Sequence, residues 1–413
     1  MSVLSNPSFT RIWSGQLISQ VGDKFYAIAL AVWIVEKTGS ATLMAVLLIA
    51  SMVPGLIVGP FAGALVDRWS RKAVMICADL VRSAAVAGVA LLSHAGALGV
   101  WEVVTAAAVI SVASAFFAPA LSASLPAIVG GERLSEANSL SQLGGGITNV
   151  LGPACGALVL GFLGYSAVFG INAASFLVSA GLVAASRVPS RARQTGARGL
   201  TASVAQGIQY VLRNRGILSV LAVVALVHFG VGGLSVAMPF LAGSLRGLRA
   251  TNLGYLEALV GVGMITGSIV VSRVSRELKQ GRLYAALAAL GVALAAAGVL
   301  ETADVTEIAP FLACSAVMGG MIAAAASFWT TLLQRGTPDD LRGRIFGIST
   351  TLGNASLPLG MALSGFALDR ARFGVIFAPG GVVLLLAAIV IGLVFAGRYK
   401  EPARAASSSG PAD

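Results

Sequence analysis

The chain has 413 residues, of which 57% are hydrophobic and only 11% are charged, and its mean hydropathy is +0.88. A soluble domain carries about 25% charged residues, so this composition excludes an ordinary soluble globular protein. Three cysteines and two histidines are too few for a disulfide framework or a metal cluster, and no nucleotide-binding or catalytic signature appears. The sequence therefore predicts a membrane protein with no cofactor, no metal and no enzymatic activity.

Apolar stretches long enough to cross a bilayer recur along the whole chain. A helix needs about 20 apolar residues to span the hydrocarbon core. No cleavage site follows the first stretch, so we expect a membrane helix there rather than a signal peptide. We predict an all-α membrane protein that is a monomer in the lipid bilayer, with twelve transmembrane helices at 10–35, 41–66, 73–93, 98–120, 137–162, 165–186, 216–243, 251–272, 283–300, 306–333, 344–368 and 373–396.

The net charge of +11 comes mostly from residues in the gaps between the spans. With the N-terminus inside, 21 of the 28 Lys and Arg residues fall on the inner side and five on the outer side, whereas Lys24 and Arg82 lie within spans. This asymmetry follows the positive-inside rule. It predicts a protein of the inner (cytoplasmic) membrane with both termini in the cytoplasm, and it argues against a nucleic-acid partner.

The two halves of the chain resemble each other. The sequence E-R-L-S-E-A-N-S-L near residue 132 corresponds to D-D-L-R-G-R-I-F-G near residue 339, and Gly63–Val66 corresponds to Gly267–Val270. We therefore expect two six-helix bundles related by pseudo-two-fold symmetry, an arrangement of secondary transporters. The predicted divisions are a bundle at 1–186, a basic cytoplasmic linker with a short amphipathic helix at 187–215, a bundle at 216–397 and a disordered cytoplasmic tail at 398–413.

The connection after the second span reads G-A-L-V-D-R-W-S-R-K from residue 63 to residue 72. It resembles the G-x-L-a-D-r-x-G-r-k signature of the major facilitator superfamily, except at Ser70, where that family prefers glycine. Glycine allows two helices to approach, and a carboxylate can cap the N-terminus of a neighbouring helix. The alternative is a plain positive-inside stop. The resemblance implies an inner-face latch, broken on opening, that contains Gly63, Asp67, Arg68 and Arg71.

Other segments resemble the macrolide-efflux and enterobactin-exporter branch of the same superfamily. They include Ser19–Asp23 in span one, Asp79–Arg82 in span three and Pro338–Arg344 before span eleven. The resemblance covers nearly the whole chain. It implies a two-bundle fold, alternating access, and export of a small-molecule substrate driven by a coupling proton or another ion.

Span five contains the sequence L-G-P-A-C-G-A at residues 151–157. It is similar to the antiporter motif of drug exporters through Gly152, Pro153 and Gly156, and this similarity favours export. The alternative is an ordinary packing kink, because glycine and proline are tolerated in membrane helices.

Ionisable residues inside spans are functional candidates, because each costs at least ~2.5 kcal/mol at bilayer depth. Asp23 lies near the middle of span one without a partner three or four residues later, so it is the first candidate to carry the coupling proton. Asp79 and Arg82 lie three residues apart on one helix face. They can neutralise each other, which favours a structural role over coupling. Glu257 in span eight is a further candidate, unless it only reaches the outer rim.

A drug-binding cavity is mostly apolar with a few polar groups. Residues of both kinds occur inside spans, and each of them could equally be a packing residue. The cavity candidates are Gln142, Asn149, His228, Phe116 and Trp329.

The leading interpretation is a secondary active transporter that exports amphipathic small molecules of the drug or macrolide type by proton-coupled alternating access. A siderophore, lysolipid or metabolite exporter of the same fold is the alternative. A membrane enzyme or sensor is disfavoured, because the chain has no cluster of nucleophile and base residues and no appended soluble domain.

Overall fold

The computed structural model describes residues 3–66, 69–189, 209–274 and 280–395, and every regular element in them is a helix. The first half contains η1 (Val3–Ser5), α1 (Pro7–Thr38), α2 (Ala41–Ala50), α3 (Val53–Val66), α4 (Arg71–His94), α5 (Val100–Val129), η2 (Gly131–Arg133) and α6 (Leu134–Ala184). The second half contains α8 (Arg215–Ser244), α9 (Arg249–Val274), α10 (Gln280–Thr302), α11 (Ile308–Gly336), α12 (Asp339–Leu368) and α13 (Phe373–Phe395). The prediction of an all-α protein is confirmed.

The long element α6 contains two of the predicted spans, 137–162 and 165–186. The chain turns between them at Gly164, whose φ of 73° and ψ of 176° suit only a residue without a Cβ. The predicted span 41–66 is instead divided into α2 and α3 by a turn at Ser51 and Met52.

The helices account for twelve crossings. In the part of the chain that the structure describes, ten helices are long and apolar enough to cross a membrane. The turn within α6 adds an eleventh crossing, and α12 is the twelfth. α12 is less apolar because it carries polar side chains such as Ser349 and Ser356, which are buried among other helices rather than exposed to lipid.

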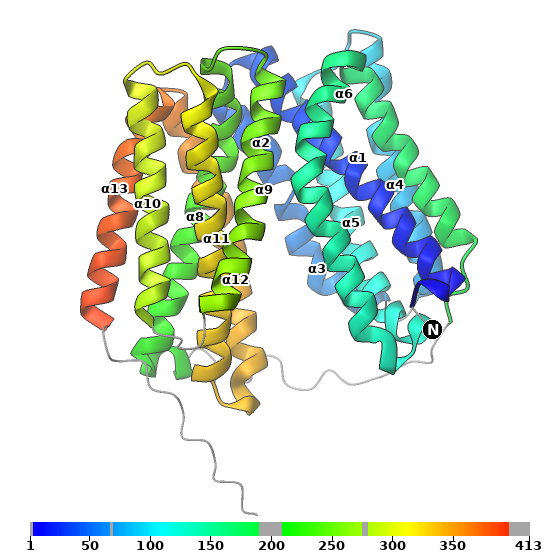
Figure 1. Ribbon diagram of the computed structural model, residues 1–413. Coiled ribbons are helices and arrows are strands. Elements are labelled where there is room, and N and C mark those ends of the chain that lie inside the picture. Colours follow the sequence, from blue (N-terminus) through cyan, green and yellow to red (C-terminus); the bar gives the residue numbers. More distant parts are fainter. Residues whose placement is uncertain (1–2, 67–68, 190–208, 275–279, 396–413) are drawn as a thin grey trace, which may run out of the picture.

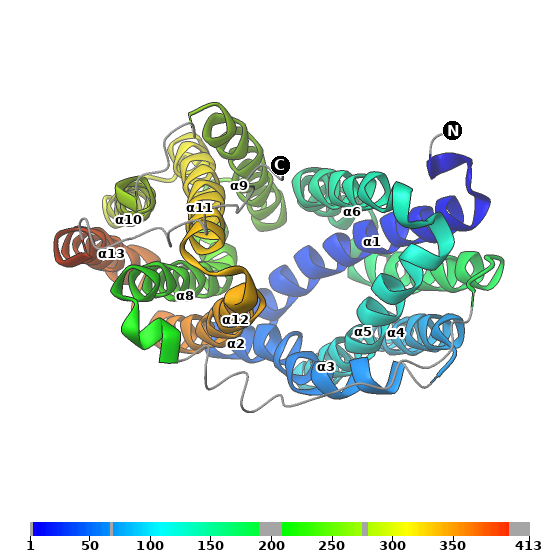
Figure 2. The same cartoon turned by 90° about the horizontal axis from the view of Figure 1, so that it is seen from below.

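The helices form two bundles, as the sequence predicts (Figure 1). In the first bundle, α1 packs on α6, and α4 packs on α5 and α6. In the second, α10 packs on α13, α9 on α11 and α8 on α12. Contacts between the bundles come mainly from α2 with α12 and from α6 with α9, and Figure 2 shows these pairs adjoining where the two groups of helices meet.

α1 begins and α13 ends on the same side of the molecule, which we call the terminal face. The other side is the opposite face. The ribbons of the two bundles come together near the opposite face and spread apart toward the terminal face (Figure 1). At the opposite face, a methyl group on Gly365 of α12 would lie 2.7 Å from Cβ of Ala45 on α2, so the two helices are in close contact there.

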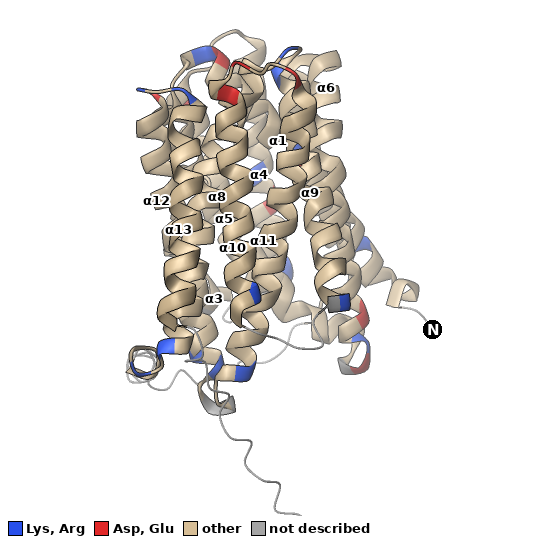
Figure 3. Ribbon diagram, turned by 60° about the vertical axis from the view of Figure 1, so that its left-hand side comes forward, with Lys and Arg blue, Asp and Glu red and all other residues tan. Residues whose placement is uncertain are grey.

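Basic residues are distributed unevenly between the two faces (Figure 3). At the opposite face they are mixed with carboxylates: Arg372 pairs with Glu301 and Asp304, and Arg246 pairs with Glu307. At the terminal face they lie near the helix ends, at Arg11, Arg71, Lys72, Arg133, Arg187, Arg213, Arg215, Arg273, Arg282, Arg335, Arg342 and Arg344.

The predicted linker and tail fall largely outside the described residues. Of the linker at 187–215, residues 190–208 lie outside them, and residues 209–213 form a short helical turn. The tail at 398–413 lies wholly outside, so both divisions remain predictions.

Candidate functional site

A cavity of about 530 Å³ lies between the two bundles. Its walls come from α1, α2, α5 and α6 of the first bundle and from α8, α9 and α11 of the second. Small-molecule sites have volumes of about 300–1,000 Å³ and are lined mainly by apolar side chains. This cavity fits both criteria. Its polar lining residues are Lys24, Tyr26, Ser51, Asn149, Ser235 and Glu257.

Two glycines of the antiporter-like segment bring α6 against α1. A methyl group on Gly152 would lie 2.7 Å from Cβ of Lys24, and one on Gly156 would lie 3.0 Å from Cα of Phe25. Neither approach leaves room for a side chain, as is common where membrane helices pack closely. Pro153, between the two glycines, lines the central cavity.

Glycines on α9 make a matching contact with α6 from the second bundle. A methyl group on Gly254 would lie 2.6 Å from Cβ of Ala157, and one on Gly261 would lie 3.0 Å from Cγ2 of Val150. Glu257 is three residues after the first glycine and four before the second, so the three residues share one helix face. Glu257 is therefore held beside residues 150–157 of α6.

Lys24 and Glu257 are the charged residues among the described ones that line the cavity. Both are half-buried, and neither makes an ion pair or a side-chain hydrogen bond with another described residue. The charge of Lys24 nevertheless acts on Glu257. Sequence reasoning found Glu257 but did not select Lys24, although a lysine in the middle of an apolar span is itself a signal of function.

Asp23 is not among the residues that line the cavity. Nδ2 of Asn172 on α6 donates a hydrogen bond to Oδ1 of Asp23 at 3.3 Å. Gly22 makes this contact possible, because a methyl group there would lie 2.5 Å from Oδ1 of Asn172. Asp23 thus lies within the first bundle, at the contact between α1 and α6.

Asp79 and Arg82 contact each other, as their spacing predicts. Oγ of Ser179 donates a second hydrogen bond to Asp79 at 2.8 Å. The guanidinium of Arg82 lies 4.5 Å from the ring centroid of Phe117 and 4.6 Å from that of Phe176, which are cation–π distances. Asp79 is fully buried and Arg82 is 7% exposed. This geometry fits a structural ion pair.

The five cavity candidates do not gather in one place. Asn149 lines the central cavity, whereas Gln142 is exposed on α6. His228 and Trp329 lie together in the second bundle, with ring centroids 5.6 Å apart. Nδ1 of His228 donates to the carbonyl oxygen of Val224 at 2.8 Å, so the imidazole is held by its own helix.

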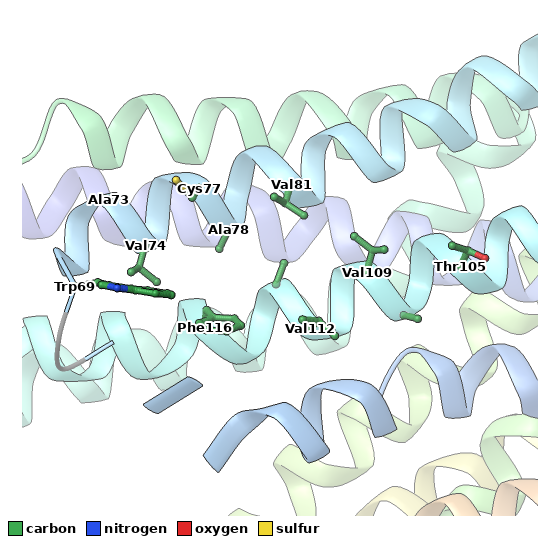
Figure 4. Close-up of a pocket in the computed structure, with 12 residues that line it drawn as sticks. Trp69, Ala73, Val74, Cys77, Ala78, Val81, Thr105, Val109, Val112 and Phe116 are labelled. Carbon is green, nitrogen blue, oxygen red and sulfur yellow. The ribbon is translucent and has the colours of Figure 1, made fainter. Parts of the chain in front are cut away.

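Phe116 lies outside the central cavity, in a groove between α4 and α5 (Figure 4). The groove has a volume of about 680 Å³, and its walls include Val74, Val81 and Val109. The rings of Trp69 and Phe116 stack in it with centroids 6.4 Å apart. Among the described residues, no charged side chain lines this groove, and the groove belongs to the first bundle alone.

The predicted inner-face latch is described only in part. Asp67 and Arg68 lie outside the described residues. Nη1 of Arg71 donates to the carbonyl oxygen of Ala123 on α5 at 2.8 Å, which ties the start of α4 to α5. A methyl group on Gly63 would meet no described atom within 4 Å, so the described residues contain no close helix approach at this glycine.

A carboxylate at the opposite face links the two bundles. Asp369, at the C-cap of α12, accepts hydrogen bonds from N of Ala41 at 2.5 Å, N of Thr42 at 3.2 Å and Oγ of Ser40 at 3.1 Å. These groups form the N-terminus of α2, where the helix dipole favours an anion. Partial desolvation acts to raise the pKa of Asp369, but the hydrogen bonds outweigh it and hold the pKa below its usual value.

Most of the sequence matches a known family. The family model of the Major Facilitator Superfamily matches residues 12–356. The chain belongs to the Major Facilitator Superfamily. This transporter is 25% identical to macrolide efflux protein A of Streptococcus pyogenes over 389 residues, which cover 94% of this chain and 95% of that protein. It is 27% identical to the multidrug efflux pump Tap of Mycolicibacterium fortuitum over 398 residues, covering 93% and 94%.

Solved structures share the fold of this superfamily member. A bacterial homologue of the iron transporter ferroportin in its inward-facing state matches with a TM-score of 0.74 at 17% identity, covering 97% of this chain and 100% of that one. The nucleoside transporter NupG matches with a TM-score of 0.71 at 12% identity, covering 95% and 100%. At these identities the likeness is one of fold alone.

Removing the carboxylate of Asp369 is expected to open the opposite face more often. Asp369→Ala deletes the three hydrogen bonds between α12 and α2. A single cysteine, Met44→Cys, reports on opening, because Met44 lines the cavity on α2. In a variant without the native cysteines, we expect several-fold faster labelling by a membrane-impermeant maleimide added from the opposite face. This corresponds to a change of about 1 kcal/mol in the free energy of opening.

The hydrogen bonds between Asp369 and α2 also predict how labelling depends on pH. The pKa of Asp369 is depressed when its carboxylate contacts α2. Asp369 therefore stabilises the closed opposite face above its free pKa of about 3.9. That stabilisation is lost only as the pH falls through the depressed value. The ratio of the labelling rates of Asp369→Ala and its Met44→Cys parent should therefore stay constant between about pH 5 and pH 8, because thiol reactivity changes with pH equally in both. Arg370→Ala, whose side chain contacts Phe366 of its own helix, is the control. Equal labelling rates for Asp369→Ala and the parent would disprove the proposed role of Asp369 in holding the opposite face closed.

Proposed function

We propose that this transporter exports amphipathic small molecules of the drug or macrolide type, in exchange for protons. The observation that carries the proposal is the apolar cavity between the bundles, which contains the unpaired carboxylate of Glu257. The similarity to a macrolide efflux protein and a multidrug efflux pump supports this substrate class. The chain acts as a monomer in the bilayer, and its other partners are the cargo and the proton.

Export requires that the cavity open to one side of the membrane at a time. The bundles are joined at the opposite face by Asp369 and α2, and they spread apart toward the terminal face (Figure 1). The excess of Lys and Arg at the terminal face supports its location in the cytoplasm together with both termini. In this orientation the conformation receives cargo from the cytoplasm.

Glu257 couples the export of cargo to the entry of protons, because it binds either a proton or a cationic group of the cargo, but not both. A buried carboxylate is costly unless it is neutralised, and either partner neutralises it. Cargo that enters from the cytoplasm displaces the proton inward. A proton that enters from outside then displaces the cargo outward, so the proton gradient drives export without ATP.

Asp23 is a second proton-binding group that acts on conformation rather than on cargo. It contacts Asn172 at the α1–α6 contact and does not line the cavity. Neutralising it changes the hydrogen bond that joins these two helices. Asp79 and Arg82 hold the neighbouring part of the first bundle in place.

Asp23→Asn is expected to abolish gradient-driven accumulation while leaving cargo binding intact. Asparagine has the shape of the protonated acid but cannot release a proton. Equilibrium binding and vesicle uptake of tetraphenylphosphonium, a permanent cation, separate the two effects. Glu102→Gln, which removes an exposed carboxylate on α5, is the control. Uphill uptake by Asp23→Asn with the pH profile of the parent would remove Asp23 from the mechanism.

Cells that express the chain test the proposed function and its alternative together. Expression should lower the accumulation of a macrolide, and a proton ionophore should abolish the difference. Unchanged macrolide levels combined with altered siderophore or lysolipid export would replace the proposed substrate class with the alternative one.

A further inference from the structure

Two opposite charges face the central cavity from different bundles. Lys24 comes from α1 and Glu257 comes from α9. Neither has a bonded partner within the described part of the chain, so each brings into an apolar space a charge that no ion pair or hydrogen bond satisfies. Such charges are costly at membrane depth. A ligand that supplies both counter-charges would remove both costs.

The α6 segment holds the two charged residues at the same level of the cavity, Lys24 on α1 and Glu257 on α9. The start of the Lys24 side chain lies against Gly152, where a methyl group would come within 2.7 Å of Cβ and 2.8 Å of Cγ. From the other bundle, Gly254 and Gly261 press α9 onto residues 150–157 of α6, on either side of Glu257. Close contacts on both sides prevent α1 and α9 from sliding along α6 in this conformation.

The two walls differ in what they offer to a ligand. On the α1 wall, the Lys24 ammonium is a donor. On the α9 wall, Glu257 is an acceptor. The cavity is lined mainly by apolar side chains and has a volume of about 530 Å³.

We propose that Lys24 and Glu257 form a two-charge site that selects dipolar amphiphiles. The cargo's ammonium group faces Glu257, and its carboxylate faces Lys24. This selectivity rests on the proposed export function and narrows its substrate class. A cargo that is only cationic satisfies Glu257 but leaves Lys24 uncompensated, so it binds less tightly than a matched zwitterion.

Two dyes that differ by one methyl ester test this selectivity. Rhodamine 110 carries a free carboxylate, and rhodamine 123 is its methyl ester. Their binding to the purified protein in lipid nanodiscs at neutral pH can be measured by fluorescence polarisation. We expect the parent to prefer rhodamine 110 by about tenfold, the effect of one charge-assisted hydrogen bond. Lys24→Met should abolish the preference by weakening rhodamine 110 alone, whereas Glu257→Gln should weaken both dyes.

Lys37→Met is the matched control, because it makes the same change at an exposed position on the same helix. It should leave both affinities unchanged. The exchange variant Lys24→Glu/Glu257→Lys keeps both charges and should retain the preference for rhodamine 110. It keeps the test decisive if one of the single variants folds poorly. Equal effects of Lys24→Met on the two dyes, or no effect on either, would overturn the two-charge site.

Vesicle transport of the same dyes separates this site from the proposed function. Export of both dyes without any preference in binding would support export and overturn the two-charge site. A binding preference that depends on Lys24, in vesicles that move neither dye, would support the two-charge site and disprove export.

Discussion

Replacing Glu257 with glutamine is expected to abolish uphill export and to weaken the binding of tetraphenylphosphonium by about 100-fold. Glutamine keeps the shape of the side chain but removes both the counter-charge for the cargo and the site for the proton. Truncating one partner of a buried charge pair costs about 2–5 kcal/mol, and the expected loss lies in this range. Binding to the purified protein and uptake into vesicles measure the two losses.

Glu102→Gln serves as the control for this substitution, since it neutralises an exposed carboxylate near the start of α5. Both variants should insert and purify like the parent. If Glu257→Gln binds the cation as tightly as the parent and still accumulates it, the carboxylate in the cavity has neither of its proposed roles.

Replacing Arg82 with methionine is expected to lower the free energy of unfolding by about 3–5 kcal/mol. The substitution leaves the carboxylate of Asp79 fully buried, with Ser179 as its remaining side-chain donor. It also removes the cation that lies between two aromatic rings. Denaturant unfolding in mixed micelles measures the loss.

A double variant separates the ion pair from the packing around it. Asp79→Leu/Arg82→Met removes both charges and should recover most of the lost stability, because a buried pair replaced by apolar residues is often neutral. Arg246→Met is the control, since Arg246 and Glu307 are both largely exposed and their ion pair should contribute less than about 1 kcal/mol. A loss for Arg82→Met no larger than for Arg246→Met would contradict the structural role.

The arrangement of spans could be predicted because lipid forces the backbone to satisfy its own hydrogen bonds, so each crossing is a long apolar helix. Hydropathy does not register local breaks. The turn at Ser51 and Met52 lies in an apolar run, and the helix between residues 134 and 184 is continuous except at Gly164. α12 was predictable as a span although its polar side chains face other helices.

The candidate site was predictable only where a residue is conspicuous in its own span. Glu257 and Asp23 stand out as carboxylates among apolar residues. The role of Asp369 depends on partners 327–329 residues away in sequence, on α2. The position of Lys24 depends on its close contact with Gly152 on another helix, α6. For Gly152 and Gly156, the sequence left open a kink or an antiporter motif, and the geometry is that of close packing between α1 and α6.

The cavity candidates illustrate a second limit. Aromatic and polar residue types in a span do not reveal which side of the helix faces the other bundle. Asn149 lines the central cavity, whereas Phe116 lines the groove between α4 and α5, and Trp329 packs on His228. Only the packing of whole helices decides these positions.

Proton-driven export is tested most directly by the uptake of tetraphenylphosphonium into sealed vesicles that contain only the purified protein, with an imposed pH gradient and no ATP. The membrane potential is clamped at zero with potassium and valinomycin, so that the cation responds only to the transporter. We expect accumulation in vesicles with an acidic interior, its collapse on addition of nigericin, and no accumulation with Glu257→Gln. Accumulation that is indifferent to the pH gradient, or that appears only when ATP is supplied, would contradict proton-driven export.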